Sequence, residues 1–136
     1  MTSVSLIKQY SVFLVNQPGA LKKFSDLFYS EEVNILAISQ DVRYDAAVVR
    51  VAIDSDNDEI NYAITKAGFT SVKTDAICIN ARNRVGVIRE IGEVLSKEGI
   101  NITTIYGSVS EGPRSRIIIV VNNIAKAMEI LEKSDL

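Results

Sequence analysis

Two short polar segments, each containing a glycine, are the parts of this sequence best suited to bind a small molecule. They comprise Asn16, Gln17, Gly19 and Ala20 in the first segment, and Asn83, Arg84, Gly86 and Val87 in the second. Each segment follows an aliphatic stretch and precedes a helical pattern, which predicts a turn from a strand into a helix. Such a turn exposes backbone N–H groups at the positive end of the helix dipole, where a carboxylate is favoured. These residues are therefore predicted to bind a ligand, and none of them is assigned a catalytic role.

The two turns differ in charge. The first turn is neutral, whereas the second carries Arg82 and Arg84, and Arg89 follows one turn into the next helix. Because arginine can hold a carboxylate or phosphate with two parallel hydrogen bonds, the second turn is predicted to be the better anion site. Two structural explanations stay open. Gly19 and Gly86 can serve only to form the turns, and the arginines can form a solvated surface.

Both turns belong to an internal repeat. Shifted by 67 residues, the sequence aligns with itself from Tyr10 to Ile64 without a gap. Each copy is predicted to contain, in order, a strand, a helix, two strands and a helix. Residues 70–74 add a last strand to the first copy. In the second copy, a hairpin turn is predicted at residues 111–113. The sequence therefore predicts an α+β fold of two ferredoxin-like βαββαβ units, packed as a pseudo-twofold pair, with antiparallel sheets and helices on one face.

Apolar residues at helical spacing predict which helix faces are buried. The predicted stripes are Leu21, Phe24, Leu27 and Phe28 in the first copy, and Ile88, Ile91, Val94 and Leu95 in the second.

The predicted domains are residues 1–73 and 74–136. The second copy ends directly after its last helix, so its final strand is missing. The segment Thr2-Ser3-Val4-Ser5 resembles Thr70-Ser71-Val72-Lys73, and each precedes the first strand of a copy. We therefore expect residues 2–7 to complete the sheet of the second unit, so that the two halves exchange strands.

The composition excludes several classes of function. The chain has 136 residues and a formal net charge of −2, so the basic surface typical of nucleic acid binding is not expected. No apolar run is long enough to span a membrane and no secretory signal is recognised, so we expect a cytoplasmic protein. The sequence has one cysteine, Cys78, and no histidine. The absence of histidine excludes nucleophile pairs in which histidine acts as the base. We expect no metal and no cofactor.

The repeat resembles the ACT domain family over essentially the whole chain. The phrase Val12-Phe13-Leu14-Val15-Asn16-Gln17-Pro18-Gly19-Ala20-Leu21 is similar to the opening of many ACT domains, as is Glu32-Val33-Asn34-Ile35 to a later segment. In the second copy, residues 82–88 and Gly99-Ile100-Asn101-Ile102 show the same pattern.

This resemblance implies a function. ACT domains bind small molecules, mostly amino acids, at the interface between two domains, and they regulate enzymes or transporters. The resemblance also implies that Asn34 and Asn101 line a ligand site; alternatively, these asparagines only favour an unusual backbone conformation after a helix.

The leading hypothesis is a non-catalytic regulatory module. It would bind an amino acid or similar carboxylate between ACT units, form a homodimer and signal to a separate enzyme or other protein. The alternative is a structural oligomerisation domain without a ligand, for which filled turns at Gly19 and Gly86 would be the sign. A small enzyme is the third hypothesis, although no catalytic constellation can be named.

Overall fold

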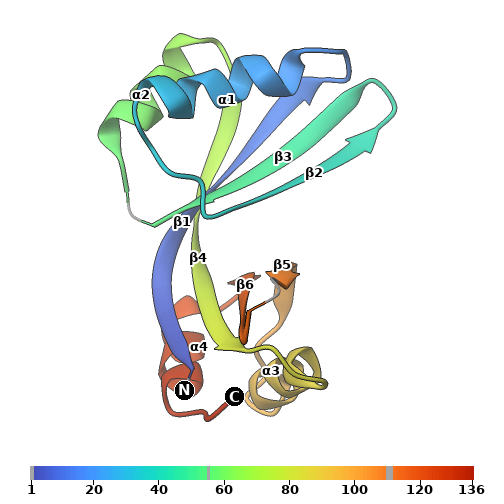
Figure 1. The fold of residues 1–136 in the computed structure, drawn as a ribbon, viewed down its shortest axis with the longest axis vertical. Coiled ribbons are helices and arrows are strands. Elements are labelled where there is room, and N and C mark those ends of the chain that lie inside the picture. Colours follow the sequence, from blue (N-terminus) through green and yellow to red (C-terminus); the bar gives the residue numbers. More distant parts are fainter. Residues whose placement is uncertain (1, 55, 110–111) are drawn as a thin grey trace. The chain divides into compact units, whose positions relative to one another are not determined.

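The computed structural model describes residues 2–54, 56–109 and 112–136 (Figure 1). These residues form two compact units. The first unit is Lys8–Thr74, and the second combines residues 2–7 with Asp75–Leu136. The predicted hairpin turn at residues 111–113 falls partly on residue 111, which lies outside the described residues.

The first unit has the predicted βαββαβ order. Its elements are β1 (Ser3–Val15), α1 (Ala20–Ser30), β2 (Ala37–Arg43), β3 (Ala46–Ile53), α2 (Asp58–Lys66) and β4 (Thr70–Arg82), of which β1 and β4 continue into the second unit. The strand order is β2-β3-β1-β4, with β3 antiparallel to both of its neighbours. Both helices cover one face of this sheet (Figure 1).

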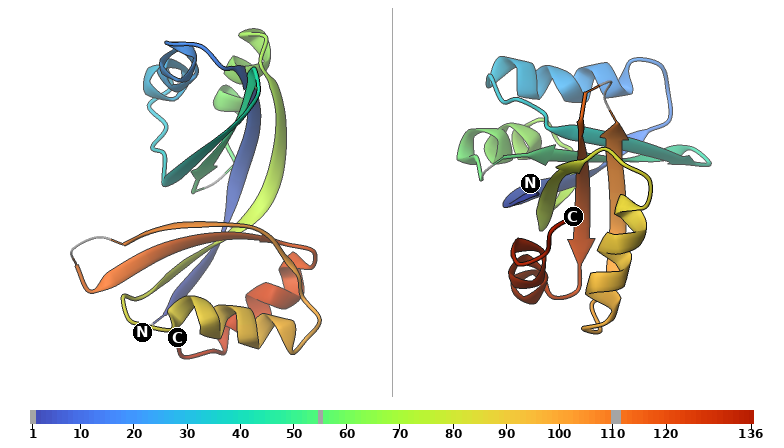
Figure 2. Two further views of the ribbon diagram at one scale, coloured as in Figure 1. Left: turned by 90° about the vertical axis from the view of Figure 1, so that its right-hand side faces the viewer. Right: turned by 60° about the horizontal axis from the view of Figure 1, so that its bottom comes forward.

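The second unit repeats this arrangement. Its remaining elements are α3 (Val87–Ser96), β5 (Ile102–Val109), β6 (Arg114–Val121) and α4 (Ile124–Glu132). The strand order is β1-β4-β6-β5, and α3 and α4 lie on one face of the sheet (Figure 2). The predicted fold class, two βαββαβ units with antiparallel sheets, is therefore confirmed.

The N-terminal residues supply the strand that the second copy of the repeat lacks. The Thr2 hydroxyl donates a hydrogen bond to the Leu136 carbonyl oxygen at 2.6 Å, and the Leu136 backbone N–H donates to the Thr2 hydroxyl oxygen at 3.1 Å. Val4 packs against the apolar core of the second unit, which also contains the buried side chain of Leu136. Residues 2–7 thus take the place of the final strand next to β4.

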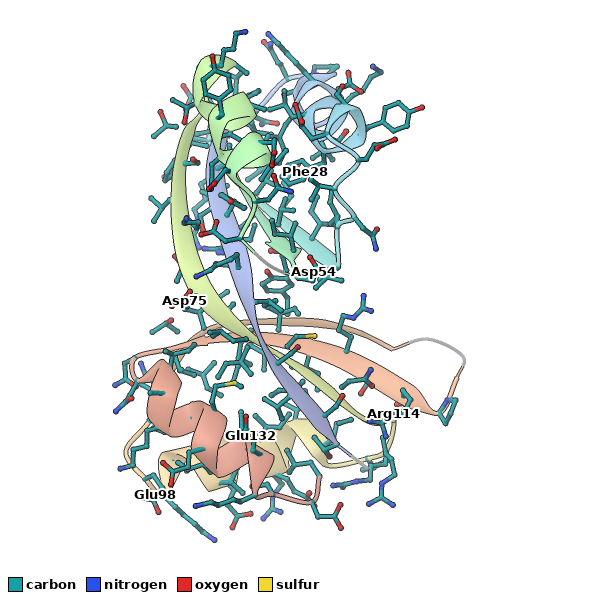
Figure 3. All side chains as sticks on the ribbon, turned by 90° about the vertical axis from the view of Figure 1, so that its left-hand side faces the viewer. Phe28, Asp54, Asp75, Glu98, Arg114 and Glu132 are labelled. Carbon is teal, nitrogen blue, oxygen red and sulfur yellow. The ribbon has the colours of Figure 1, made fainter. Side chains whose placement is uncertain are left out.

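The inward-facing helix residues differ partly from the prediction. Phe24 and Phe28 of α1 are buried as predicted, and Phe28 is labelled in Figure 3. However, Leu21 is 40% exposed and Ile88 is 52% exposed, whereas Val87 is buried. The reason is the i, i+4 spacing of a helix: residues 20, 24 and 28 share one face of α1, and residues 87, 91 and 95 share one face of α3.

The repeat is not free of gaps in three dimensions. Val12 lies opposite Val49 in the first unit, and the equivalent Ile79 lies opposite Ile117 in the second. Val49 is separated from Ile117 by 68 residues, since 117 − 49 = 68, so the second hairpin is one residue longer than the first. Ala47 therefore corresponds to Ser115, and the gap-free alignment through this region is wrong.

None of the helices formed by the described residues has the length and apolar character needed to span a bilayer.

We predict that Thr2→Val destabilises the protein by about 1 kcal/mol, because two hydrogen bonds to Leu136 are lost while the side chain keeps its shape. Urea denaturation would measure the free energy of unfolding. Thr70→Val, at the exposed threonine that begins β4, is the matched control. Equal effects of both substitutions would show that the Thr2 contact contributes no stability.

Candidate functional site

The glycines of both predicted turns have left-handed backbone conformations. Gly19 has φ 86° and Gly86 has φ 94°, which side-chain-bearing residues rarely adopt. This geometry supplies a structural reason for both glycines. It also makes them the N-cap residues of α1 and α3.

These two helix starts lack the side-chain caps that the other helices have. Asn57 caps α2 by accepting a hydrogen bond from the Ile60 backbone N–H at 2.8 Å, and Asn123 caps α4 in the same way. Glycine has no side chain that could accept such a bond, and no side chain caps α1 or α3 within the described residues. Apart from the Ala20 N–H, which donates to the Gln17 carbonyl oxygen at 3.3 Å, the first-turn amides of α1 and α3 can therefore receive an acceptor from outside the helix, such as a carboxylate.

A cavity lies at the start of α1 in the first unit, with a volume of about 90 Å³. Its buried part is formed by Leu14 of β1 and Ala47 of β3, which lie opposite each other in the sheet. The complete lining is Leu14, Val15, Asn16, Gln17, Gly19, Ala20, Leu21, Gln40 and Ala47. The structure therefore brings the four predicted residues of the first turn together around one cavity.

A larger groove shares part of this lining. It has a volume of about 320 Å³ and includes Phe13, Lys23 and Phe69. Because Gln17 and Ala20 line both spaces, the cavity and the groove are neighbours at the start of α1.

Asn16 has a structural role in addition to its place in the cavity wall. Its backbone N–H donates to the Asp45 carbonyl oxygen at 2.8 Å, and its side-chain Nδ2 donates to the Tyr44 carbonyl oxygen at 3.2 Å. The turn is thereby attached to the β2–β3 hairpin. The side-chain Oδ1 of Asn16 is the atom that keeps acceptor capacity for a ligand. In the second unit the Asn83 backbone N–H makes the corresponding bond to the Pro113 carbonyl oxygen at 2.7 Å.

The second turn already holds a carboxylate from its own helix. Arg84 Nη1 donates to Glu90 Oε1 at 3.2 Å, and Nη2 donates to Oε2. The hydrogen bond from Arg84 holds the pKa of Glu90 below its ordinary value, and the same bond raises the pKa of Arg84. Glu90 therefore balances the charge of Arg84 but not the charges of Arg82 and Arg89, so the preference of this turn for an anion is weakened.

The second turn also carries a larger side chain than the first. Val87, which corresponds to Ala20, is buried in the core of the second unit. Glu90 was not among the residues predicted from the sequence, although its place one turn into the helix after Arg84 signals an ion pair. Gln40 and Ala47 were not predicted either, because they reach the first cavity only through strand pairing.

The predicted asparagines Asn34 and Asn101 lie elsewhere. Asn34 follows the C-terminal end of α1, where it lines a depression of about 530 Å³ with Tyr29 and Glu32. The Asn101 backbone N–H donates to Asn122 Oδ1 at 3.0 Å, and its carbonyl oxygen accepts from the Asn122 N–H at 3.2 Å. Within each unit, the structure does not join these asparagines to the glycine turn.

The asparagines do not carry the unusual backbone conformation either. In this region Glu32 and Gly99 have positive φ angles, of 56° and 71°. An unusual backbone conformation therefore does not explain why asparagine stands at positions 34 and 101.

The other polar groups of the described chain suggest structural roles. Burial raises the pKa of the Cys78 thiol, which disfavours the reactive thiolate. The buried Tyr10 hydroxyl donates to Asn61 Oδ1, and burial raises its pKa to about 12. In the described residues no group of three or more His, Cys, Asp or Glu side chains is placed to hold a metal ion.

Comparison with known proteins gives one family match. Residues 77–133 match the family model of the ACT domain. No sequence among curated proteins matches the chain.

Solved structures extend the likeness to both units. A protein from Bacteroides thetaiotaomicron is 26% identical, with a TM-score of 0.84, and the match covers 96% of this chain and 89% of that one. The regulatory subunit of aspartate kinase from Thermus thermophilus, in its ligand-free form, is 16% identical, with a TM-score of 0.73 and coverage of 97% and 95%. The aspartate kinase of Clostridium acetobutylicum is 14% identical, with a TM-score of 0.69, and the match covers 99% of this chain and 34% of that enzyme.

We predict that Glu90→Gln reduces the loss of stability in acid. Since the folded-state pKa of Glu90 is lowered, the ion pair contributes fully above the ordinary glutamate pKa of about 4.3 and is lost as the pH falls through the lower folded value. The free energy of unfolding should therefore be lower in the variant at neutral pH and should fall less on acidification. Urea denaturation at several pH values would measure both effects.

The control for this experiment is Glu59→Gln, which removes another glutamate from the first turn of a helix, in this case α2. If both variants showed the same dependence on pH, the helix dipole alone would explain the effect and the pair with Arg84 would contribute nothing.

Proposed function

We propose that this chain, which carries an ACT domain over residues 77–133, is a non-catalytic regulatory module that binds an amino acid or similar small carboxylate. The observation that carries this proposal is the cavity at the start of α1, next to backbone amides that no side chain caps. A ligand carboxylate would accept hydrogen bonds from these amides at the positive end of the helix dipole. The first turn, rather than the basic second turn, is the proposed site.

Similar proteins support a regulatory role. One of the matching folds is the regulatory subunit of an aspartate kinase, which is a chain of comparable length without a further domain in the match. Another is part of a complete aspartate kinase. By analogy, we expect this chain to act on a separate enzyme or other protein partner.

The mechanism requires a second arrangement of the protein. A ligand shifts an equilibrium only if it binds one arrangement more tightly than the other. The outermost strand of the first unit suits an equilibrium between separate chains and chains associated along this strand. β2 is an edge strand whose Ile38 and Val42 side chains are partly exposed, on the same sheet face as the buried Val51 and Ala47.

Leu21 of α1 is also partly exposed and lines the cavity together with Gln40 of β2. Association of two chains along β2 would cover these apolar side chains and enclose the ligand. We therefore propose a homodimer whose interface includes the binding site.

The second unit favours a different role. Val87 and the Arg84–Glu90 pair occupy its turn, as expected for an assembly domain without a ligand. We propose that the first unit serves ligand binding and that the second unit holds no ligand at its turn.

We predict that at least one L-amino acid at millimolar concentration raises the melting temperature of the protein, whereas its primary amide does not. The amide lacks the carboxylate that the α1 amides would hold. A ligand at about 100 times its dissociation constant adds about 2.7 kcal/mol of stability, which a thermal-shift assay detects easily. If no amino acid stabilised the protein, or if the amide stabilised it equally, the proposed function would be wrong.

We predict that Ile38→Lys shifts the protein from dimer to monomer, because a charge would enter the proposed apolar interface. Analytical ultracentrifugation would measure the mass in solution. Val72→Lys, at an exposed valine of β4, changes the same chemistry away from β2 and should leave the dimer intact. A dimer that survived Ile38→Lys but not Val72→Lys would place the interface elsewhere.

A further inference from the structure

We infer that Tyr44, at the tip of the β2–β3 hairpin, docks against the segment around Glu32 of a second copy of this chain, with Arg43 beside it facing the Glu32 carboxylate. The inference rests on the homodimer of the proposed function and names the side chains that hold the two copies together. It depends on backbone strain at two exposed residues, on their places at the two ends of β2, and on the charges beside them.

Tyr44 has a backbone conformation that its side chain disfavours. Its φ angle is 59°, and it is the first of the two residues that connect Arg43 to Ala46, which pair with each other across the hairpin. Glycine usually takes a left-handed position in such a turn, because a bulky side chain is strained there. Tyr44 is also 96% exposed, so its ring contacts almost nothing in its own chain that offsets the strain.

Glu32 is the second residue of this kind. Among the described residues, Glu32 and Tyr44 are the two that combine a positive φ angle with a residue type other than glycine. The counterpart of Glu32 in the second unit is Gly99, which adopts its positive φ angle without strain. Glu32 is exposed, and within the described ranges its carboxylate takes part in no ion pair. Strain at exposed residues is a sign of function, and here it indicates contacts outside the chain.

The two strained residues lie beyond opposite ends of β2, which is the edge strand of the first unit. Two copies that pair along this strand about a two-fold axis run antiparallel, and facing residues are equidistant from the axis. An axis at any position from Ile38 to Gln40 places Tyr44 opposite one of residues 32–36 of the second copy. The same symmetry places the second Tyr44 against the first copy, so the contact is made twice.

The surface that would receive Tyr44 is the depression at the C-terminal end of α1. Its lining includes the buried Phe28 and the half-buried Val33, together with the exposed Glu32 and Asn34. A tyrosine suits such a surface because its ring is apolar and its hydroxyl can donate a hydrogen bond. The ring would cover Val33, and the hydroxyl would donate to a polar side chain at the rim.

The charges beside the two strained residues are complementary. Arg43 is 82% exposed, and its ion pair with Asp41, at 3.6 Å, is long and solvated. Glu31 and Glu32 bring two carboxylates to the receiving segment. Opposite charges on the two sides of an interface favour association and fix its register. Because each copy carries both the positive and the negative member, a second copy of the chain is the partner that fits.

The hairpin tip is held in place before a partner binds. Asn16 donates hydrogen bonds to the carbonyl oxygens of both tip residues, Tyr44 and Asp45. A contact surface that is already ordered loses less conformational entropy on association. The tip therefore presents Tyr44 in a fixed direction.

Analytical ultracentrifugation of the full chain over a concentration series would measure the dissociation constant of the dimer. We expect Tyr44→Gly to raise this constant at least about tenfold, because tyrosine is one of the residue types that contribute most to interfaces. Tyr62→Ala, at an exposed tyrosine of α2, is the matched control and should leave the constant unchanged. Urea denaturation of the monomer, at low concentration, should show that Tyr44→Gly does not lower the free energy of unfolding, because glycine relieves the strain.

A charge reversal tests the register. Arg43→Glu and Glu32→Arg should each raise the dissociation constant, since each places like charges opposite each other. The double variant should lower it again toward the wild-type value, because the pair is reversed but kept.

An unchanged dissociation constant in Tyr44→Gly would overturn the inference, as would a loss of monomer stability that accounts for the loss of dimer. Additive effects of the two charge substitutions would also overturn it. In each case Ile38→Lys would still report on the β2 interface of the proposed function. A wild-type chain that stayed monomeric at all concentrations would show that both the inference and the homodimer are wrong, while the thermal-shift assay would still decide ligand binding.

Discussion

The left-handed backbone at Gly19 and Gly86 is the constraint on which the proposed function depends. Each glycine turns the chain from a strand into a helix with a positive φ angle. Ser, Asp and Asn cap helices from an N-cap residue with extended backbone, which the left-handed conformation does not provide. The geometry that makes the turn therefore also leaves the helix amides available. α2 and α4 show the usual arrangement, in which an asparagine side chain, that of Asn57 or Asn123, caps the helix.

The two units differ in the side chains that surround this helix end. In the second unit, Arg84 and Glu90 form an ion pair beside the turn, and Val87 is buried in the apolar core. In the first unit, the equivalent positions carry Gln17, Lys23 and Ala20, which leave a neutral cavity with a cation nearby. The repeated fold thus provides two chemically distinct helix starts, which differ in the charge and volume of a few side chains.

Most of the fold was predictable because its signals are local. Strand and helix patterns, glycine turns and the 67-residue repeat are read from neighbouring residues, and they predict two βαββαβ units. The errors have physical causes. Leu21 and Ile88 were predicted to be buried, but the i, i+4 face begins one residue earlier at positions 20 and 87. The repeat was aligned without a gap, but strand pairing shows that the second hairpin is longer by one residue.

The sequence by itself determined where the chain turns and where a helix start could accept an anion, since Gly19 and Gly86 are constrained by their own backbone. Only the tertiary structure showed which side chains surround each of these places. Gln40 and Ala47 reach the first turn through pairing across β2, β3 and β1, and Glu90 neutralises Arg84 through a contact between side chains. Whether a space is empty, and what charge surrounds it, depends on residues distant in sequence that folding brings together. A list of local motifs therefore could not rank the two turns.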